Sequence, residues 1–255
     1  MTHPVNRPFI MVAPNGARRG RGDHPALPVT SDQIALTAVA CHRAGADALH
    51  LHVRDGQGGH SLDAGRYREA LAEIAAHVPQ MTVQITTEAA GVFDVAAQLA
   101  CLRDLRPHWA SVSVREIARA PELAGQVYGL CADQGIRVQH ILYDTADIAQ
   151  MVAWRDAGII APEQDQVLFV LGRYRENQQS SPADLAPFRA ALPDARDWMV
   201  CAFGTREHAC LAAAATQGGQ LRVGFENSLT DADGTPYPDN AASVAALRSL
   251  LERQP

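Results

Sequence analysis

Eight short runs rich in Val, Ile, Leu and Phe recur along the chain, each followed by a turn and then by a segment of helical periodicity. The units average about 32 residues, close to the size of one βαβ repeat. The repeat therefore predicts a single (β/α)8 TIM barrel that takes up residues 1–255 as one domain. The predicted strands are Phe9–Ala13, Ala48–Val53, Thr82–Thr86, Trp109–Val114, Arg137–Leu142, Gln166–Leu171, Trp198–Phe203 and Leu221–Phe225.

A doubly wound open sheet is the competing fold, but the fingerprint G-x-G-x-x-G of its nucleotide site does not follow the first strand. The chain there is Ala13-Pro14-Asn15-Gly16-Ala17-Arg18. Thr30 and Gln33 predict a capping box at the start of the first helix. Gly218-Gly219 resembles a phosphate loop but precedes the last strand, so we expect it to end a helix.

The composition excludes several kinds of chemistry and partner. All 22 basic residues are arginine. Schiff-base, pyridoxal-phosphate and P-loop chemistry, which need a lysine amine, are therefore excluded. The net charge of −6 argues against a nucleic-acid partner.

Signals for a membrane, for export and for disulfides are missing from the sequence. The chain has no apolar run of about 18 residues and no stretch of signal-peptide length at its start, so we expect a cytoplasmic protein with no membrane partner. The five cysteines are odd in number and lack C-x-x-C spacing, which predicts reduced packing residues.

Two histidines lie on the second predicted strand, Ala48-Leu49-His50-Leu51-His52-Val53-Arg54-Asp55. Because side chains alternate along a strand, His50, His52 and Arg54 point into the barrel together. This pattern has two interpretations: a pair of metal ligands, or two core histidines with hydrogen-bond partners.

The eighth predicted strand adds a carboxylate on the same side. Its alternation puts Arg222, Gly224 and Glu226 on one face. In a closed barrel this strand is only two strands from the histidines, roughly 10 Å away. Two histidines and a glutamate with open positions suit a catalytic Zn²⁺ that acts as a Lewis acid on a carbonyl. The alternative is an ion pair of Glu226 with Arg222 or Arg54.

Segments spread over nearly the whole chain resemble, in order, the β-keto acid cleavage enzymes, whose founding activity is 3-keto-5-aminohexanoate cleavage. The His-x-His of strand two together with the Arg-x-x-x-Glu of strand eight is the specific part of the resemblance. The matching segments are Ala13-Pro14-Asn15-Gly16-Ala17, His50-Leu51-His52-Val53-Arg54-Asp55, Ile85-Thr86-Thr87, Val170-Leu171-Gly172 and Gly218-Gly219-Gln220-Leu221-Arg222-Val223-Gly224-Phe225-Glu226.

The resemblance implies a Zn²⁺-dependent barrel enzyme. Such an enzyme condenses a β-keto acid with acetyl-CoA and cleaves the adduct into acetoacetate and a new acyl-CoA. The resemblance also implies zinc ligands at His50, His52 and Glu226, a substrate-binding arginine at Arg222, and a catalytic hydroxyl at Thr86.

One departure from the family concerns the catalytic base. The residue after the zinc glutamate is usually an aspartate that is proposed to be the base, but here it is Asn227, which cannot accept a proton at neutral pH. We predict that Glu116, directly after the fourth strand, takes over proton abstraction. His140 as the base, or a structural role for Glu116, are the alternatives.

A second departure concerns the far end of the substrate. Arg18 stands where the founding enzyme has a glutamate that recognises the substrate amine, so we expect a substrate whose far end is not cationic. Arg18, Arg19 and Arg21 also fit a solvated basic loop or a site for the CoA phosphates. The positions predicted to bind substrate are Asn15, Arg18, Arg54 and Asn227.

Two further functions stay open at this point. A metal-dependent hydrolase of the amidohydrolase type also uses His-x-His in a barrel, but on strand one, with an aspartate on strand eight and often a bridging lysine. A non-catalytic, metal-bound ligand sensor would explain the loss of the aspartate at Asn227. For the cleavage enzyme, the partners are a small β-keto acid and acetyl-CoA, and we expect a homo-oligomer.

Overall fold

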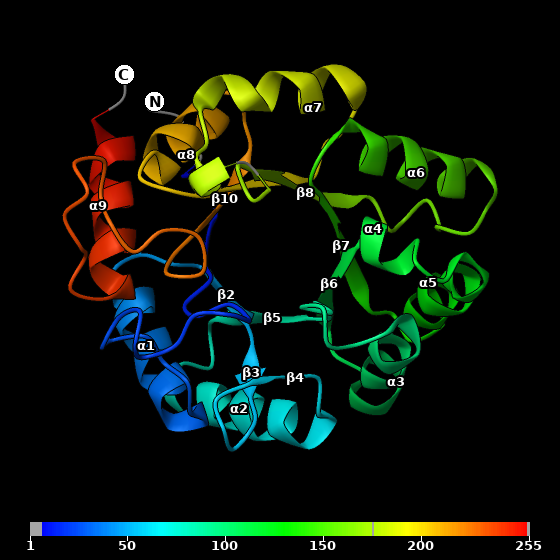
Figure 1. The fold of residues 1–255 in the computed structure, drawn as a ribbon, viewed down its shortest axis with the longest axis horizontal. Coiled ribbons are helices and arrows are strands. Elements are labelled where there is room, and N and C mark those ends of the chain that lie inside the picture. The colour runs from blue at the N-terminus through cyan, green and yellow to red at the C-terminus, as the bar shows by residue number, and fades with distance from the viewer. Residues whose placement is uncertain (1–6, 175, 254–255) are drawn as a thin grey trace, which may run out of the picture.

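The computed structural model describes residues 7–174 and 176–253, in which eight parallel strands close into a barrel (Figure 1). Around the ring the order is β1-β10-β9-β8-β7-β6-β5-β2, and β3 and β4 form a separate two-stranded sheet. The eight predicted strands are confirmed to within two residues at each end. The strands are β1 Ile10–Val12, β2 Ala48–Leu51, β3 Val53–Arg54, β4 His60–Ser61, β5 Thr82–Thr86, β6 Trp109–Ser113, β7 Arg137–Leu142, β8 Gln166–Leu171, β9 Trp198–Ala202 and β10 Gln220–Val223.

Helices surround the strand ring, as Figure 1 shows. The α-helices are α1 Ser31–Arg43, α2 Ala64–His77, α3 Val95–Leu105, α4 Val114–Ile117, α5 Ala124–Asp133, α6 Thr145–Asp156, α7 Leu185–Ala191, α8 Glu207–Ala215 and α9 Asn240–Glu252. Three short 3₁₀ helices are η1 Pro121–Leu123, η2 Glu176–Gln178 and η3 Pro182–Asp184. Within the described ranges no helix is both long and apolar enough to cross a bilayer.

Local sequence signals set the ends of several helices. Thr30 and Gln33 form the predicted capping box of α1. After α8 the backbone turns at Gly218, whose φ is +81°, so the predicted helix termination is confirmed. A side chain at Gly219 would lie 2.5 Å from the Trp198 ring, so this position also needs glycine for packing.

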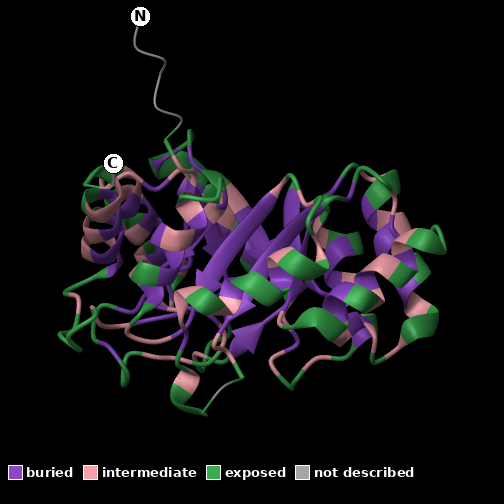
Figure 2. Ribbon diagram, turned by 90° about the horizontal axis from the view of Figure 1, so that it is seen from above, coloured by how far each residue is buried: buried purple, intermediate pink, exposed green. Residues whose placement is uncertain are grey.

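Apolar side chains form two layers of core. The larger layer lies between the strands and the helices, and the smaller one fills part of the barrel interior around Met11, Leu168 and Met199. Figure 2 shows the buried strands and the exposed outer faces of the helices. All five cysteines are buried and unpaired, as expected.

The second predicted strand differs from the structure at its carboxyl end. We expected it to run to Val53, but β2 ends at Leu51, and Val53–Arg54 instead pairs with β4 in an antiparallel ribbon. At His52, between the two strands, the main-chain carbonyl accepts a hydrogen bond of 3.1 Å from the Asn15 side chain. A side chain thus replaces the strand partner at the point where the chain leaves the barrel.

Candidate active site

Three potential metal ligands converge at the carboxyl ends of β2 and β10. His50 Nε2 and His52 Nε2 are 3.1 Å apart. Glu226 Oε2 lies 3.7 Å from the first and 3.6 Å from the second. The three ligand atoms lie within 4.8 Å of one another, so this cluster could hold one metal ion.

The barrel topology explains this convergence. β1 pairs with β2 on one side and with β10 on the other, so the two ends of the chain meet at β1. His50 and His52 point to the interior. Glu226 lies in the turn after β10, and its amide nitrogen donates to the Ala13 carbonyl. The predicted neighbourhood of strands two and eight is confirmed.

The orientation of His50 is fixed by a chain of amides across the barrel. His50 Nδ1 donates to Gln84 Oε1 at 2.7 Å, and Gln84 Nε2 donates to Gln139 Oε1 at 3.0 Å. With the proton on Nδ1, His50 directs the Nε2 lone pair toward His52 and Glu226. Burial, and then the charge of Arg222, also lower the pKa of His50 well below its usual value, which favours the neutral form that binds metals.

The carboxylate of the cluster has the properties of a metal ligand. Glu226 Oε2 is buried and has no hydrogen-bond partner among the residues that the structure describes, and such a buried oxygen is costly unless a cation compensates it. Burial opposes its ionisation, but the opposing effects, of which the charge of Arg222 is the largest, hold the pKa of Glu226 well below its usual range. The residues present therefore fit a divalent cation.

A glycine in the loop after β1 leaves room for this carboxylate. Gly16 has a φ of +62°, and a Cβ at this position would lie 2.6 Å from Glu226 Cγ. Both the backbone conformation and the close approach therefore need glycine. The Gly16 segment of the family resemblance thus acts by making space for Glu226.

Arg222 lies beside the cluster with unused hydrogen-bonding capacity. Its Nη2 is 3.5 Å from Glu226 Oε1, so the ion pair that we considered as an alternative exists alongside the cluster. Its Nε and Nη1 are buried and have no partner within the described part of the chain. The free Nη1 of this guanidinium can donate to a carboxylate from a ligand.

The end of β5 brings a carboxylate that the sequence did not reveal. Glu88 Oε2 lies 4.0 Å from His52 Nε2, and Glu88 pairs with Arg18 at 2.5 Å. The amide of Glu88 donates to the hydroxyl of Thr86, which is fully buried. Glu88 follows a strand end on the face of the barrel that carries chemistry, and this position was the signal that could have identified it.

Two of the predicted substrate-binding residues hold the loop between β1 and α1. Arg54 donates to the main-chain carbonyls of Gly16, Arg19 and Gly58. The Asn15 amide donates to Pro28 and His52 carbonyls, and its Oδ1 is a buried atom without a partner. Asn15 lines the cavity beside the cluster, whereas Arg54 binds the loop that forms part of the cavity wall.

The structure does not bring the two predicted base candidates to the ligand atoms. Glu116 Oε2 accepts hydrogen bonds from Ala89 N and Gln98 Nε2, and burial raises its pKa. His140 lies on the helix side of β7, where its Nε2 contacts the Gln164 carbonyl and its ring packs against Tyr128. The inward residue of that strand is its neighbour Gln139, because alternate residues point to opposite faces.

A second buried carboxyl pairs with Asn227. Glu207 Oε1 accepts from Asn227 Nδ2 at 3.1 Å and from Gly224 N at 3.2 Å. Burial raises the pKa of Glu207 to about 8, although both hydrogen bonds oppose this shift. Asn227 itself has no carboxylate, but its side chain is thus hydrogen-bonded to the carboxyl group of Glu207.

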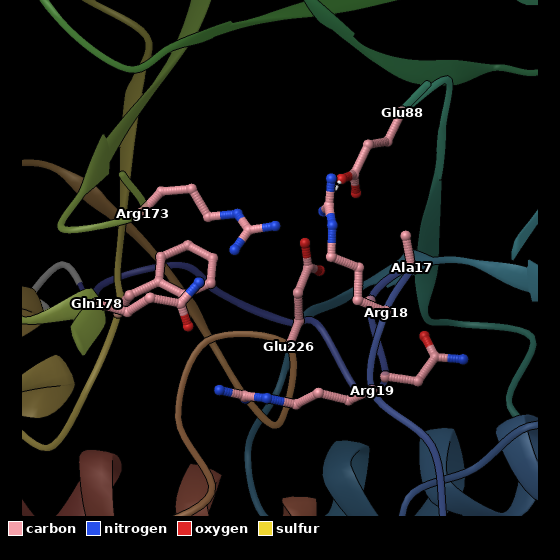
Figure 3. A pocket seen from close by; sticks show the side chains of 10 residues that line it. Ala17, Arg18, Arg19, Glu88, Arg173, Gln178 and Glu226 are labelled. Atoms are coloured by element: carbon pink, nitrogen blue, oxygen red, sulfur yellow. Dashed lines mark hydrogen bonds and ion pairs between the residues drawn. The ribbon is translucent and has the colours of Figure 1, made fainter. Parts of the chain in front are cut away.

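A cavity of about 130 Å³ opens beside Glu226 and is lined by Arg18, Arg19, Arg173 and Glu88. In Figure 3, Arg173 and Arg18 flank the Glu226 carboxylate from opposite sides, and Arg18 extends to Glu88. The cavity gives a small molecule access to the ligand cluster.

The fold is an eight-stranded parallel barrel with a His₂Glu cluster, one that could hold a metal ion, at the end of the barrel where barrel enzymes carry their active sites. The profile of the beta-keto acid cleavage enzymes matches residues 8–254, and the chain belongs to this family.

Individual relatives agree with this assignment. The chain is 27% identical over 254 residues to the 3-keto-5-aminohexanoate cleavage enzyme of Fusobacterium nucleatum subsp. nucleatum, with 96% of this chain and 89% of that protein covered. It is 27% identical over 264 residues to the 3-oxoadipate:acetyl-CoA acetyltransferase of Cupriavidus necator, with 99% and 90% covered.

Solved structures share the fold. The apo structure of ObcA superposes with a TM-score of 0.69 at 17% identity over 89% of this chain. The chain spans only 62% of the length of ObcA. At this level of identity the likeness shows the barrel fold alone.

Proposed function

We propose that the protein is a Zn²⁺-dependent enzyme that condenses a β-keto acid with acetyl-CoA and releases acetoacetate and a new acyl-CoA. The carrying observation is the convergence of His50, His52 and Glu226 on one point beside the unpaired donors of Arg222. Family membership and relatives named for 3-keto-5-aminohexanoate cleavage and for 3-oxoadipate:acetyl-CoA acetyl transfer support the reaction class.

The reaction can be written so that every bond is accounted for. A proton leaves C2 of the β-keto acid, C2 forms a bond to the carbonyl carbon of acetyl-CoA, and the C–S bond of the thioester breaks to release the CoA thiolate. The thiolate then adds to C3 of the acid, and the C2–C3 bond breaks, which leaves the remaining acyl group on the sulfur of CoA. C1 and C2 depart with the acetyl group, and C2 takes the proton back to give acetoacetate.

The residues of the chain divide this work among them. A zinc ion held by His50, His52 and Glu226 would supply Lewis acidity toward the ketone and carboxylate oxygens of the acid. Arg222 would bind the carboxylate through its unpaired Nη1 and so orient the C2–H bond. Thr86, with its hydroxyl at the end of β5, is the proposed hydroxyl contact of the substrate.

The proton acceptor has two candidates, and geometry distinguishes them. Glu116, the base that the sequence predicts, has a raised pKa that suits a base, but its carboxylate holds the Ala89 amide. Glu88 lines the cavity and comes within 4.0 Å of His52 Nε2. Because a base must first reach the proton, we favour Glu88 for proton transfer and Glu116 for positioning its loop.

Metal analysis and a product assay test the proposal together. The purified protein should contain near-stoichiometric zinc and release acetoacetate from acetyl-CoA and at least one β-keto acid. The double variant His50→Ala/His52→Ala should lose both, whereas His77→Ala on the exposed face of α2 should keep both.

Each unfavourable outcome has a separate meaning. Full zinc content in the double variant would rule out the ligand assignment. Zinc binding and keto-acid binding without any product would instead support the ligand sensor, which the asparagine at Asn227 first suggested.

A further inference from the structure

The cavity beside the ligand cluster is lined by more arginine side chains than its carboxylates pair with. Arg18 is paired with Glu88. Arg19 and Arg173 line the same cavity, and neither has a carboxylate within ion-pair distance among residues 7–174 and 176–253. Two guanidiniums are therefore available to a ligand.

Both side chains are held in place by neighbours that leave their charge unbalanced. Arg173 lies over the Phe203 ring at 5.0 Å, a contact that positions the guanidinium without neutralising it. Arg19 donates to the main-chain carbonyl of Phe225, next to Glu226. Figure 3 shows the Arg173 side chain directed toward the centre of the cavity.

The two guanidiniums line one cavity and carry like charges, so they repel each other. Burial is the main cause that lowers the pKa of Arg19, and the charge of Arg173 acts in the same direction, while the acidic side chains of Glu207, Asp23 and Glu226 oppose this shift. An anion bound between Arg19 and Arg173 would remove this repulsion and add charge-assisted hydrogen bonds.

We propose that Arg173 and Arg19 form an anion subsite for a second carboxylate, so that the preferred β-keto acid is a dicarboxylate. This inference rests on the proposed function, because it assumes that the β-keto acid end lies at Arg222 and the ligand cluster. The second carboxylate then lies in the cavity that Glu226 lines together with Arg19 and Arg173.

Acetyl-CoA is the other source of anionic groups, but its phosphates fit this subsite less well. They are separated from the reacting thioester by the whole pantetheine arm. Arg19, Arg173 and Glu226 line one cavity of about 130 Å³. An anionic group bound there must be joined by a short chain to the group that reacts beside Glu226, as it is in a small diacid.

Kinetics with matched acids test the subsite. The substrates are a six-carbon 3-oxo diacid and its ω-amide, which have the same size but differ in one charge. For the wild type we expect kcat/KM for the diacid to exceed that for the amide by roughly tenfold or more. Arg173→Gln should lower the value for the diacid by about the same factor and leave the amide within about twofold.

The control is Arg21→Gln, which removes an equal charge from the same loop. Arg21 is exposed, and among the described residues its side chain donates to the Pro25 carbonyl alone, so the kinetics with both acids should be unaffected. An equal loss for both acids in Arg173→Gln would overturn the proposal. Replacing acetyl-CoA by acetyl-pantetheine separates the sources, since a phosphate role would make the effect of Arg173→Gln disappear with the shorter thioester.

Direct binding keeps the test independent of turnover. Calorimetry of adipate against hexanoate should show roughly tenfold tighter binding of the diacid to the wild type, and no such preference in Arg173→Gln. If no β-keto acid is cleaved but this preference is present, the proposed function fails and the subsite stands. If cleavage occurs without any preference for a second carboxylate, the subsite fails alone.

Discussion

Arg222 is a buried guanidinium with two donors, Nε and Nη1, that no described residue satisfies. Leaving such donors unpaired is costly, and a substrate carboxylate bound at the Nη1/Nη2 edge would satisfy Nη1. Arg222→Lys keeps the charge but loses the planar fork. We expect kcat/KM to fall roughly tenfold or more, a loss of about 1.4 kcal/mol in the transition state.

Zinc content serves as the control for Arg222→Lys and should stay at the wild-type level, because Arg222 is not a proposed ligand. Unchanged kinetics would leave Arg222 with only its ion pair to Glu226.

The proton acceptor can be identified by hydrogen exchange at C2. In D₂O, without acetyl-CoA, the wild type should exchange the C2 hydrogens of a bound β-keto acid. Glu88→Gln should reduce this rate by about a hundredfold or more, the usual contribution of a positioned base, at unchanged zinc content. Glu116→Gln should have a smaller effect, because its amide can still accept a hydrogen bond from Ala89 N. The reverse order would assign the base to Glu116.

Strand alternation predicted the inward side chains of His50 and His52, and the closure of the barrel brought Glu226 to them. The same alternation applied to β7 places Gln139 inward and His140 outward, which the sequence analysis did not use. Glu88 lies after a strand end, where no periodicity predicts where a side chain points. Its approach to the site became visible only in three dimensions.

At the scale of elements, the long loop between β1 and α1 depends on one side chain from β3. Arg54 donates to the carbonyls of Asn15, Gly16 and Arg19, which holds this loop against the barrel. We expect Arg54→Ala to release this loop, so that KM for the acid rises at least severalfold and limited proteolysis cuts between Asn15 and Pro28. Arg66→Ala, which removes a single bond to the Arg54 carbonyl, is the matched control.

The hydrophobic patterns predicted where the barrel strands lie, but they did not predict that β2 ends at Leu51. The apolar alternation continues through Val53, so the sequence contains no sign of the break at His52. The break depends on the Asn15 side chain, which comes from another part of the chain and replaces the strand partner. Contacts of this kind are tertiary and lie outside any local pattern.

For the whole molecule, Glu207 links global stability to pH. Its pKa is raised from an ordinary value of 4.5 to about 8 in the folded protein, mainly by burial. The stability contributed by its protonated form is complete below about pH 4.5 and is lost as the pH rises to about 8. Within that window the free energy of unfolding should fall by up to about 1.4 kcal/mol per pH unit from this group.

Denaturant unfolding at several pH values measures this contribution. Glu207→Gln can still accept the bonds from Gly224 and Asn227, so its stability advantage over the wild type should grow from pH 5 to pH 8. Glu122→Gln, on the exposed surface of η1, should follow the wild type. A difference between Glu207→Gln and the wild type that does not change with pH would contradict the assignment.

The seam between β1 and β10 also gives the cluster an order of assembly. During synthesis the chain presents His50 and His52 early, but Glu226 follows the last strand and reaches them only after β10 has docked on β1. A complete set of three ligands therefore exists only in the closed barrel. An ion that needs all three binds the native state and not the growing chain, so its uptake would mark barrel closure and then oppose reopening by mass action.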